Sequence, residues 1–558
     1  MSTRTGVMSS LAAMVVLGAA VSLTPLPAAA GKGESGRDHA TVLMKPELHH
    51  ANPLRGVDTR GPSSSHRNVS PNVGGQPSRV VADSQIVRDA NAPGTAAPVQ
   101  QTAFYGMNQL RSGSLGSGFP PDITLASSSN TVLQAVNRRV QLRTLTGGIL
   151  DTQNLDIFFK GTTTNTMFDP KVYFDRNSSR QRYYVVALDG QTPSFSRLHI
   201  AISRSATPTS FNTSSWCKYS FDARTPVSNN PVTWADYPGL GMGTRALVVT
   251  TNQFDSNNDF QYSAVWGFDK LVANNNSTSC PSLSNWRWRA SPSVGDRSAF
   301  TLQPVQQYTN VSSTTQAPNP AYMVSSYSGS SLTYRVWRIT NIGTGTPTLS
   351  VVALSGSYAY SIPPKSPGGR HPTSGNPTLI DTGDTRVLQA ASLSNRIYLS
   401  HTTGCQFTSG TALEACARYV RIDAGISSTG AMTATIVQQS ILGGGNGWYY
   451  SFPGVAVNSG GAVATAFNVG STAGYPGSAY ATKAYANSAF SGSSWLTQGT
   501  CYPNATFSSL RGYNRAGDYT GAQTSTDFST FWLSAERAVA LAGVGCGWQT
   551  RIARIQHG

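Results

Sequence analysis

Glutamate is scarce in this chain, and its scarcity limits the chemistry that can be expected. After residue 100 the sequence contains only two glutamates, Glu414 and Glu536. An enzyme that hydrolyses glycosidic bonds needs two carboxyl groups a few ångström apart, one protonated and one ionised. Such a pair would therefore have to be built mainly from aspartates.

Short catalytic motifs are also absent. The sequence has no P-loop, no Rossmann glycine fingerprint, no Gly-x-Ser-x-Gly elbow in a strand-turn-helix setting, no His-Glu-x-x-His and no Cys-x-x-Cys-His. Their absence excludes most familiar enzyme classes. Nothing resembles a nucleic-acid-binding module, so we expect no nucleic-acid partner. Glycan-active enzymes, which rarely carry short linear motifs, are not excluded.

Beyond the N-terminus no apolar run is long enough to span a membrane. Residues 7–23 form an apolar run rich in Ala, Gly and Ser, preceded by Arg4 and followed by the small residues Ala28 to Ala30. This order is typical of a secretory signal peptide. We predict a signal peptide over residues 1–30 and a monomeric protein without a membrane span, secreted to the extracellular space or the periplasm.

Two regions of different amino-acid composition and pattern follow the predicted signal peptide. Residues 31–101 are rich in Pro, Gly, Ser and Asn and have no apolar periodicity, which predicts a disordered linker or pro-segment. Residues 102–558 consist of short Val, Ile, Tyr, Thr and Trp runs broken by Gly, Asn, Ser and Pro. This texture predicts one large all-β domain.

The net charge of the chain is strongly positive. The formal charge is +16, and residues 101–558 alone hold 32 Lys and Arg against 19 Asp and Glu, a surplus of 13. A basic surplus on the folded part attracts acidic partners such as uronate-rich polysaccharides or envelope polymers, and the alternative is that it serves solubility alone.

Cysteine usage fits an exported protein. The six cysteines form an even set without zinc-type spacing, which predicts disulfides, with free buried thiols as the alternative. Fifteen pairings are possible for six cysteines, and we expect sequential pairing. The six are Cys217, Cys280, Cys405, Cys416, Cys501 and Cys546.

A repeat sets the expected architecture. Polar residues, often with a proline, precede an apolar run at Phe168-Asp169-Pro170, Asp236-Tyr237-Pro238, Gln303-Pro304, Asp384-Thr-Arg386, Phe452-Pro453 and Asp518-Tyr519. These starts are 67, 67, 81, 68 and 66 residues apart. Each interval has room for a four-stranded blade, which predicts a β-propeller.

The number of blades follows from the starts and the chain ends. The six starts, with an earlier unit over residues 122–159, give seven four-stranded blades. The last unit has only three clear strands, and the segment around Ala103 to Gly106 would supply the fourth, closing the ring and hiding two sheet edges. Six blades, or two stacked β-sandwich domains, remain alternatives.

Four of these starts also carry a resemblance. FDPKVYFD, WADYPGLGMG, GDTRVLQAAS and GDYTGAQTST resemble secreted bacterial β-propeller proteins of mostly undefined activity, distantly sialidase-like in architecture. The likeness spans roughly residues 165–555. It implies the propeller fold and brings no catalytic motif, and fold alone does not determine function.

In a propeller, ligands usually bind where the blades meet at one mouth of the central channel. The aspartates at the blade starts would form an incomplete acidic ring that holds a cation or sugar hydroxyls; the alternative is that each caps its own strand. The catalytic candidates are Asp169, Asp236, Asp384, Asp518, Glu536 and His401. The ligand-binding candidates at the starts are Arg386, Arg515, Tyr237 and Tyr519.

His401 is the one histidine among the catalytic candidates. It ends the strand Tyr398-Leu-Ser-His401 and is the best general-base candidate among the histidines of the folded part. The competing interpretation is a buried histidine with satisfied hydrogen bonds.

Two tryptophans form a further candidate. In Trp286-Arg-Trp288-Arg the strand period places both tryptophans on one face. If exposed, they would form a stacking platform for sugar rings; otherwise they pack in the core.

Two short sequence patterns are weaker indications of a functional site. Asp255, Asn257 and Asp259 repeat the opening of a calcium loop, but Phe260 replaces the turn glycine, and a polar hairpin tip is the alternative. We expect no cofactor, and calcium is the alternative. The string from Ser525 to Trp532 is like an Asp box but departs from it at two positions, and an Asp box is itself a structural turn.

These observations favour a secreted binding protein for an acidic polysaccharide or a cell-envelope component. The second hypothesis is a glycan-active enzyme, a polysaccharide lyase or a sialidase-like glycoside hydrolase, at the channel mouth. A purely adhesive surface module is the third.

Overall fold

The computed structural model describes residues 42–44, 46–53, 86–88, 99–109, 120–162, 167–176, 180–224, 226–228, 230–291, 297–308, 320–328, 332–354, 360–370, 377–407, 411–427, 431–490, 492–503 and 514–557. All of them lie in one compact unit, Gly36–Gly558. The predicted signal peptide, residues 1–30, lies outside the described residues. No helix in the described ranges is long and apolar enough to cross a membrane.

The described chain is all-β with the arrangement of a β-propeller, in which five blades stand as separate sheets. The first contains β5 (Thr124–Ser127), β6 (Thr131–Val136), β7 (Arg139–Thr144) and β8 (Ile149–Asn154). The second contains β9 (Met167–Asp175), β10 (Arg182–Thr192), β11 (Phe195–Ser203) and β12 (Trp216–Asp222). The third contains β17 (Gln303–Pro304), β19 (Ala321–Ser328), β20 (Leu332–Thr340) and β21 (Thr348–Ala353), with β1 (Val42–Met44) at its edge.

Two more sheets follow near the C-terminus. One contains β28 (Trp448–Val457), β29 (Val463–Ser471), β30 (Gly477–Lys483) and β31 (Ser493–Thr497), and β22 (Ser366–Arg370), paired with β23 (Pro377–Ile380), joins β29 in parallel. The other contains β32 (Gly521–Thr524), β33 (Thr530–Leu541), β34 (Gly545–Gln556) and β4 (Val99–Asn108). Three short helices, α1 (Leu155–Lys160), α2 (Lys270–Ala273) and the 3-10 helix at Arg297–Ala299, connect strands.

The remaining sheet has eleven strands and contains two antiparallel runs of four. The first run is β13 (Trp234–Met242), β14 (Ala246–Phe254), β15 (Phe260–Asp269) and β16 (Leu283–Arg289), with β2 (Glu47–Ala51) at its edge. The second is β24 (Gln389–Leu393), β25 (Arg396–Cys405), β26 (Glu414–Ile426) and β27 (Met432–Gly443), with β3 (Ile86–Arg88) at its edge. The two-residue strand β18 (Gln306–Gln307) joins the runs by pairing in parallel with β13 and β24.

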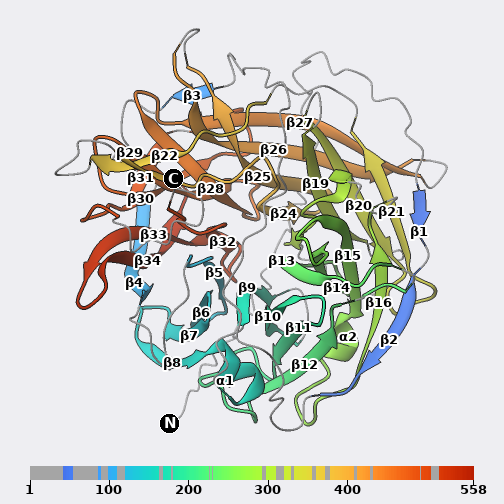
Figure 1. Ribbon diagram of the computed structural model, residues 1–558. Coiled ribbons are helices and arrows are strands. Elements are labelled where there is room, and N and C mark those ends of the chain that lie inside the picture. The colour runs from blue at the N-terminus through green and yellow to red at the C-terminus, as the bar shows by residue number, and fades with distance from the viewer. Residues whose placement is uncertain are drawn as a thin grey trace, which may run out of the picture. The chain divides into compact units, whose positions relative to one another are not determined.

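The first strands of the repeats lie around a common centre. Figure 1 shows β5, β9, β13, β24 and β32 nearest the middle, with the later strands of each repeat farther out. Each predicted start falls on or just before such an inner strand: β9, β13, β17, β24, β28 and β32. The sequence repeat therefore marks the strands that line the axis.

A bulge explains three of the four prolines at the starts. The pairing of the inner strand with its neighbour skips residues 169–170, 237–238 and 452–453. A bulged position has no ladder bond to make, so Pro170, Pro238 and Pro453 sacrifice no hydrogen bond there.

A residue in the left-handed backbone region accompanies the starts. Positive φ occurs at Asp122 (45°), Asp169 (49°), Tyr237 (51°), Thr301 (53°), Gly383 (72°), Phe452 (53°) and Gly517 (79°). Only two of these seven are glycine, although non-glycine residues seldom adopt this conformation. The surrounding contacts must hold the other five in place.

The N-terminal strand closes the last sheet as the sequence predicts. β4 pairs antiparallel with β34, and the register joins Phe104 to Ile552 and Ala103 to Ala553. This makes the last sheet four-stranded and covers the edge of β34. The described parts of residues 31–101 differ from a disordered linker, since β1, β2 and β3 pair with the outer strands β21, β16 and β27.

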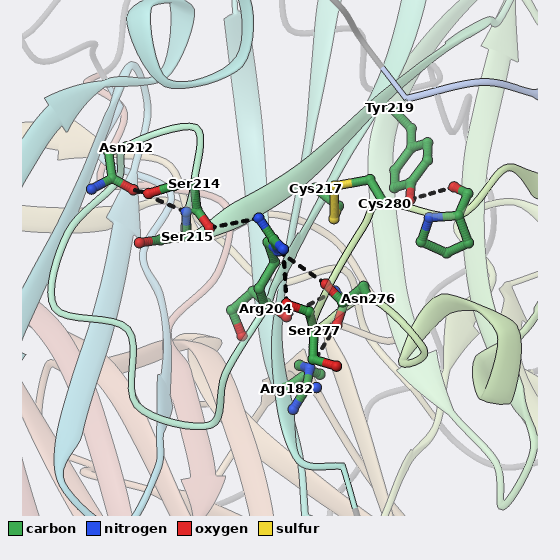
Figure 2. Close-up of a disulfide and its surroundings, with 12 residues drawn as sticks. Arg182, Arg204, Asn212, Ser214, Ser215, Cys217, Tyr219, Asn276, Ser277 and Cys280 are labelled. Carbon is green, nitrogen blue, oxygen red and sulfur yellow. Dashed lines mark hydrogen bonds between the residues drawn. A yellow bond between two sulfur atoms is a disulfide. The ribbon is translucent and has the colours of Figure 1, made fainter.

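The sequential disulfide pairing is confirmed: Cys217–Cys280, Cys405–Cys416 and Cys501–Cys546 are bonded. Figure 2 shows the first of these beside a network in which Arg204 donates to the backbone oxygens of Ser214, Asn276 and Ser277. The bond links β12 to the segment before β16 and so holds two neighbouring repeats together.

Large aromatic side chains fill the interior between sheets. Seven tryptophans are among the largest fully buried side chains: Trp216, Trp234, Trp266, Trp288, Trp337, Trp532 and Trp548. Burial of apolar surface on this scale is the main term that stabilises the fold.

Candidate functional site

Charged and aromatic side chains from several repeats meet at the blade starts. We call the following set the mouth cluster: Asp122, Asp169, Lys171, Asp236, Tyr237, Asp384, Arg386, Arg515, Asp518 and Tyr519. The four predicted aspartates, both predicted arginines and both predicted tyrosines belong to it, together with Asp122 and Lys171, which were not among the predicted site residues. The cluster therefore mixes carboxylates and cations instead of forming an acidic ring.

Asp122 and Asn137 connect the ends of the ring. Asp122 accepts the backbone N–H of Asp518 at 2.7 Å and the side-chain amide of Asn137. Asn137 in turn accepts the backbone N–H of Asp169 at 2.7 Å. Three starts, from the last sheet and the first two, are thus tied together by buried hydrogen bonds.

The cluster contains two arginine–aspartate pairs. Arg386 holds Asp384 with Nε at 2.8 Å and Nη2 at 2.6 Å, and Arg515 forms an ion pair with Asp518. The four side chains keep between 8% and 16% of their surface exposed. Burial alone would lower the pKa of each arginine, but the paired carboxylates raise it, so both stay charged.

Lys171 and the two tyrosines form the centre of the cluster. Lys171 Nζ lies 2.9 Å from the ring centroid of Tyr519 and 5.5 Å from that of Tyr237, and the rings meet edge to face at 5.8 Å. Tyr519 donates to the backbone oxygen of Pro170 and Tyr237 to that of Asp518. A desolvated ammonium over an aromatic face is a favourable contact.

Burial shifts the protonation of this site. It raises the pKa of Asp122 and Asp169 well above the usual range, helped by the neighbouring carboxylates. It raises the pKa of Asp236 to about 7 and lowers that of Lys171 to about 7. Two groups that exchange protons near neutral pH therefore lie in one cluster, an arrangement often found at functional sites.

A small cavity between the inner strands adjoins the cluster. A cavity of about 30 Å³ is lined by Lys171 and Tyr519 at the cluster and by polar residues such as Gln303, Gln306 and Gln389 from the inner strands. This space holds a few water molecules and no sugar ring. A sugar ring would therefore contact the rim of this cavity and not enter it.

Glu536 lies beside the mouth cluster. It is 6% exposed, accepts from Asn468 Nδ2 at 3.1 Å, and has a pKa raised by burial and by Asp122. A Cβ added at Gly517 would lie 3.7 Å from a carboxylate oxygen of both Glu536 and Asp122. Gly517 thus separates two buried carboxyl groups.

We expect Gly517→Ala to lower the free energy of unfolding by about 1 kcal/mol, because an alanine at positive φ is strained. Urea unfolding would measure this. Gly345→Ala is the matched control, since an added Cβ there meets nothing within 4 Å and Gly345 is not among the positive-φ residues. Equal stabilities of the two variants would contradict the expected strain.

His401 lies in the interior. Its ring is fully buried, Nε2 bonds with Tyr334 Oη at 2.7 Å, and Nδ1 bonds with the backbone oxygen of Thr402 at 2.8 Å. Burial and Arg418 lower its pKa to about 3. With both ring nitrogens in use, His401 packs as a satisfied core histidine and not as an accessible general base.

The tryptophan pair is also a packing feature. Trp288 is fully buried, and Trp286 is half-buried against the same core cluster. Arg287, on the other face, lies 4.3 Å from the ring centroid of Trp266. The two tryptophans therefore form no stacking platform open to solvent.

The calcium-like pattern is a hairpin tip. Asp255 Oδ1 accepts the backbone N–H of Asn257 at 2.8 Å and of Asp259 at 3.0 Å. The carboxylate thus closes a turn between β14 and β15. No group of three or more His, Cys, Asp or Glu side chains suited to a metal is found in the described part of the chain.

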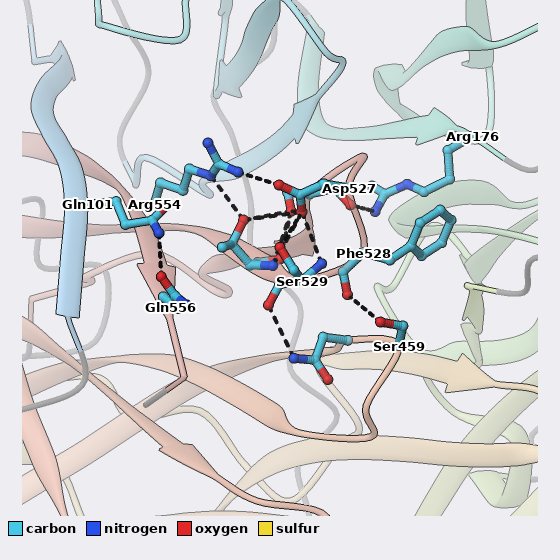
Figure 3. Close-up of polar contacts among 11 residues, drawn as sticks. Gln101, Arg176, Ser459, Asp527, Phe528, Ser529, Arg554 and Gln556 are labelled. Atoms are coloured by element: carbon cyan, nitrogen blue, oxygen red, sulfur yellow. Dashed lines mark hydrogen bonds and ion pairs between the residues drawn. The ribbon is translucent and has the colours of Figure 1, made fainter. Parts of the chain in front are cut away.

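The string like an Asp box is likewise a turn. Figure 3 shows Asp527 between β32 and β33, where it accepts from Ser529 N and Oγ at 2.9 Å and pairs with Arg554. Although burial acts to raise it, these contacts hold the pKa of Asp527 at about 2. This turn follows the C-terminal end of β32, the end away from Asp518.

Comparison with known proteins gives no family. No family model matches the chain, and no curated protein matches it. Similar solved structures include extracellular domains 1–2 of Drosophila Semaphorin 1a, with 10% identity over 83% of this chain and 89% of that chain and a TM-score of 0.34. Another is Drosophila Plexin A in complex with Semaphorin 1b, with 8% identity over 83% and 88% and a TM-score of 0.33. A third is a Penicillium chrysogenum alpha-L-arabinanase complexed with arabinobiose, with 8% identity over 69% and 92% and a TM-score of 0.29. At these TM-scores the likenesses decide nothing about function.

Proposed function

We propose that the chain forms seven blades. The seven left-handed residues at the starts support this count, because each precedes or lies in the first strand of one four-stranded unit. On this view the eleven-stranded sheet is two blades bridged by β18.

We propose that the protein is a secreted binding protein for an acidic polysaccharide or a cell-envelope component, which it contacts at the mouth cluster. The observation that carries the proposal is the pair of arginine–aspartate contacts, Arg386 with Asp384 and Arg515 with Asp518, whose side chains are largely buried but keep 8% to 16% of their surface exposed. Carboxylates of a ligand match the planar guanidinium edges and can compete with the aspartates for them.

The electrostatics of the cluster suit such a ligand. Burial and neighbouring carboxylates raise the pKa of Asp122, Asp169 and Glu536 well above the usual range, which reduces the negative charge of the cluster. The surplus of 13 positive charges on residues 101–558 then dominates at long range and draws polyanions to the surface.

We expect Arg386→Gln and Arg515→Gln each to weaken binding of an acidic polysaccharide at least about tenfold, as loss of a charge-assisted pair does. Pectate, alginate and hyaluronan would be scored for binding by calorimetry, with dextran as the neutral reference. Arg224→Gln is the matched control, because Arg224 holds Asp222 through the same Asp-x-Arg contacts but lies 45% exposed at the end of β12. Binding that survives both mouth substitutions would refute the proposal.

One observation favours a second candidate, a glycan-active lyase or hydrolase. Asp236 and Lys171 both have a pKa of about 7, the range in which general acids and bases work. The same polysaccharide panel would be scored for new reducing ends and unsaturated uronates. Release that Asp236→Asn abolishes would favour the enzyme over the binding protein.

A further inference from the structure

A buried lysine lies between two buried carboxylates where the first blade connects to the second. Lys160 is the last residue of α1, and its Nζ lies 3.0 Å from Asp156 Oδ1, one helical turn earlier, and 2.8 Å from Asp189 Oδ2 on β10. We call these three residues the lysine cluster. None of them belongs to the mouth cluster, so their chemistry is independent of the proposed function.

The lysine cluster is sealed from solvent. Its three side chains are at most 1% exposed. Phe158 and Phe159 of α1 are buried in a hydrophobic cluster that also contains Ala187 of β10. The ring of Phe159 packs on that of His199 with 5.5 Å between centroids, and His199 Nε2 lies 3.7 Å from Asp189 Oδ2. Bulk water therefore does not reach the carboxyl groups.

Keeping these charges in the interior is costly. A buried ammonium and a buried carboxylate carry a desolvation penalty that their attraction only partly offsets. Although burial acts to raise it, His199 and Lys160 hold the pKa of Asp189 below its usual range, so Asp189 is ionised. Asp189 Oδ1 has no hydrogen-bond partner in the described chain. An amide in place of the ion pair would remove both charges from the interior.

The geometry favours formation of that amide. A nitrogen at hydrogen-bond distance from one carboxyl oxygen lies within about 4 Å of the carboxyl carbon, and a near-attack pair is about 3–3.5 Å apart. Effective molarities of reacting groups held in this way reach about 10⁵–10⁸ M, which opposes the tendency of amides to hydrolyse. The ammonium must lose a proton before it attacks, and Asp156 is a carboxylate within hydrogen-bond distance of it.

We propose that Lys160 and Asp189 condense to an isopeptide bond, with Asp156 as the group that moves the protons. Asp156 takes a proton from the ammonium, and the neutral Nζ attacks the carboxyl carbon of Asp189 and forms the C–N bond. Asp156 passes this proton, and then a second one from Nζ, to one carboxyl oxygen of Asp189, whose C–O bond breaks to release water. One ammonium and one carboxylate thus give one amide and one water, and Asp156 ends as a carboxylate.

The bond fastens the connection between two blades. α1 follows β8 of the first blade and precedes β9 of the second, and β10 pairs with both β9 and β11. The isopeptide bond therefore joins the connecting helix to a middle strand of the second blade. Unlike the disulfide Cys217–Cys280, which links the second blade to the next repeat, it is not opened by thiols.

A tryptic peptide map of the full-length protein, reduced and unfolded in urea before digestion, tests the proposal. Trypsin does not cleave after an acylated lysine, so residues 144–171 are expected in one fragment that is joined to residues 183–197. Mass spectrometry should find this pair lighter by one water than the sum of its two parts. Separate fragments 144–160 and 183–197 would overturn the inference.

The same digest contains a matched control. Lys270 and Asp175 form an ion pair at 3.2 Å with both side chains 0% exposed, and among the described residues Lys270 has no second carboxylate within ion-pair distance. We expect no bond between these two residues. A linked Lys270 would show that a lone buried pair suffices, and would overturn the role of Asp156.

Two variants separate the chemical roles. Asp156→Asn lacks the proton acceptor, so the linked fraction at a fixed time after purification is expected to fall at least about tenfold. Asp189→Asn keeps a carbonyl carbon for attack, so it should give a linked fragment of the wild-type mass, with ammonia released instead of water. Circular dichroism checks that each variant is folded. A folded Asp156→Asn that links as fully as wild type, or a folded Asp189→Asn that gives separate fragments, would contradict the proposed reaction.

Discussion

A chain that begins at residue 110 is expected to lose more than about 5 kcal/mol of stability and to aggregate. Such a chain lacks β4, whose register with β34 covers Val99 to Asn108. Met107 is 2% exposed in the core with Trp548, and Phe104 packs 6.3 Å from Trp532. Buried side chains of this size contribute about 1.5–3 kcal/mol each, and the ladder bonds add to them.

Aggregation is expected because the unpaired edge of β34 is long. β34 runs over Gly545–Gln556, and without β4 its N–H and C=O groups offer a template for another strand. Calorimetry would measure the loss of stability, and size-exclusion chromatography the association.

The matched control is a chain that begins at residue 97. It keeps β4 but lacks β1, β2 and β3, which add three to five residues each to outer edges. We expect only a small loss of stability and no aggregation. If both truncated chains behaved alike, closure by β4 would not be what stabilises the last sheet.

The strand that closes the last sheet, β4, was predictable because it follows from counting the strands of the last unit. The last unit shows three strands, an unpaired segment precedes the first unit, and a ring without a partner for β34 would expose an edge. The blade starts were predictable for a local reason. A bulge needs no ladder N–H, so proline is tolerated at Pro170, Pro238 and Pro453, and the motif repeats with the bulge.

The charge balance of the mouth was not predictable from the repeat. The four predicted aspartates do meet near the axis, but Lys171, two residues after Asp169, reaches the same cluster. Asp122 begins the earlier unit, which was not among the six aligned starts, yet its carboxylate accepts the backbone N–H of Asp518 across the ring closure. Which cation neutralises which carboxylate depends on contacts between repeats that sequence spacing does not specify.

Burial also explains why His401 and Trp288 lie in the interior and not at an accessible site. Period and strand position correctly placed them on strands, but alternation along a strand does not say which face is covered by the next blade. Both faces of most strands here are covered, as the fully buried patterns of β9, β13 and β14 indicate. In such a fold an aromatic or histidine side chain packs in the interior unless it lies at a strand end or a rim.

The second large expected effect is on the pH dependence of the free energy of unfolding, to which Lys171 of the mouth cluster contributes. The folded Lys171 loses its proton near pH 7, whereas an unfolded lysine keeps it to about 10.5. The unfolded state therefore binds more protons between these values, and the wild-type protein gains stability from this group as pH rises through that window. Lys171→Met lacks this gain, so its free energy of unfolding should fall relative to wild type by about 2 kcal/mol between pH 7 and 9.

The contribution of Asp236 to stability has the opposite pH dependence, and it changes at pH values below 7. Its folded carboxyl keeps the proton to about pH 7, whereas the unfolded one releases it near 3.8, so the wild-type protein loses stability from this group as pH rises between these values. Asp236→Asn should therefore gain about 2 kcal/mol relative to wild type between pH 5 and 7. Urea unfolding across pH measures both differences.

Asp222→Asn is the control for both variants. Burial acts to raise the pKa of Asp222, but Arg224 lowers it overall, so the stability difference between this variant and wild type should stay constant above pH 5. If Lys171→Met and Asp236→Asn also gave constant differences, both side chains would have ordinary pKa values and would be hydrated in solution. The mouth would then contain no acid–base pair poised near neutral pH, and the enzyme alternative would lose the observation that favours it, while the arginine–aspartate pairs that carry the binding proposal would be unaffected.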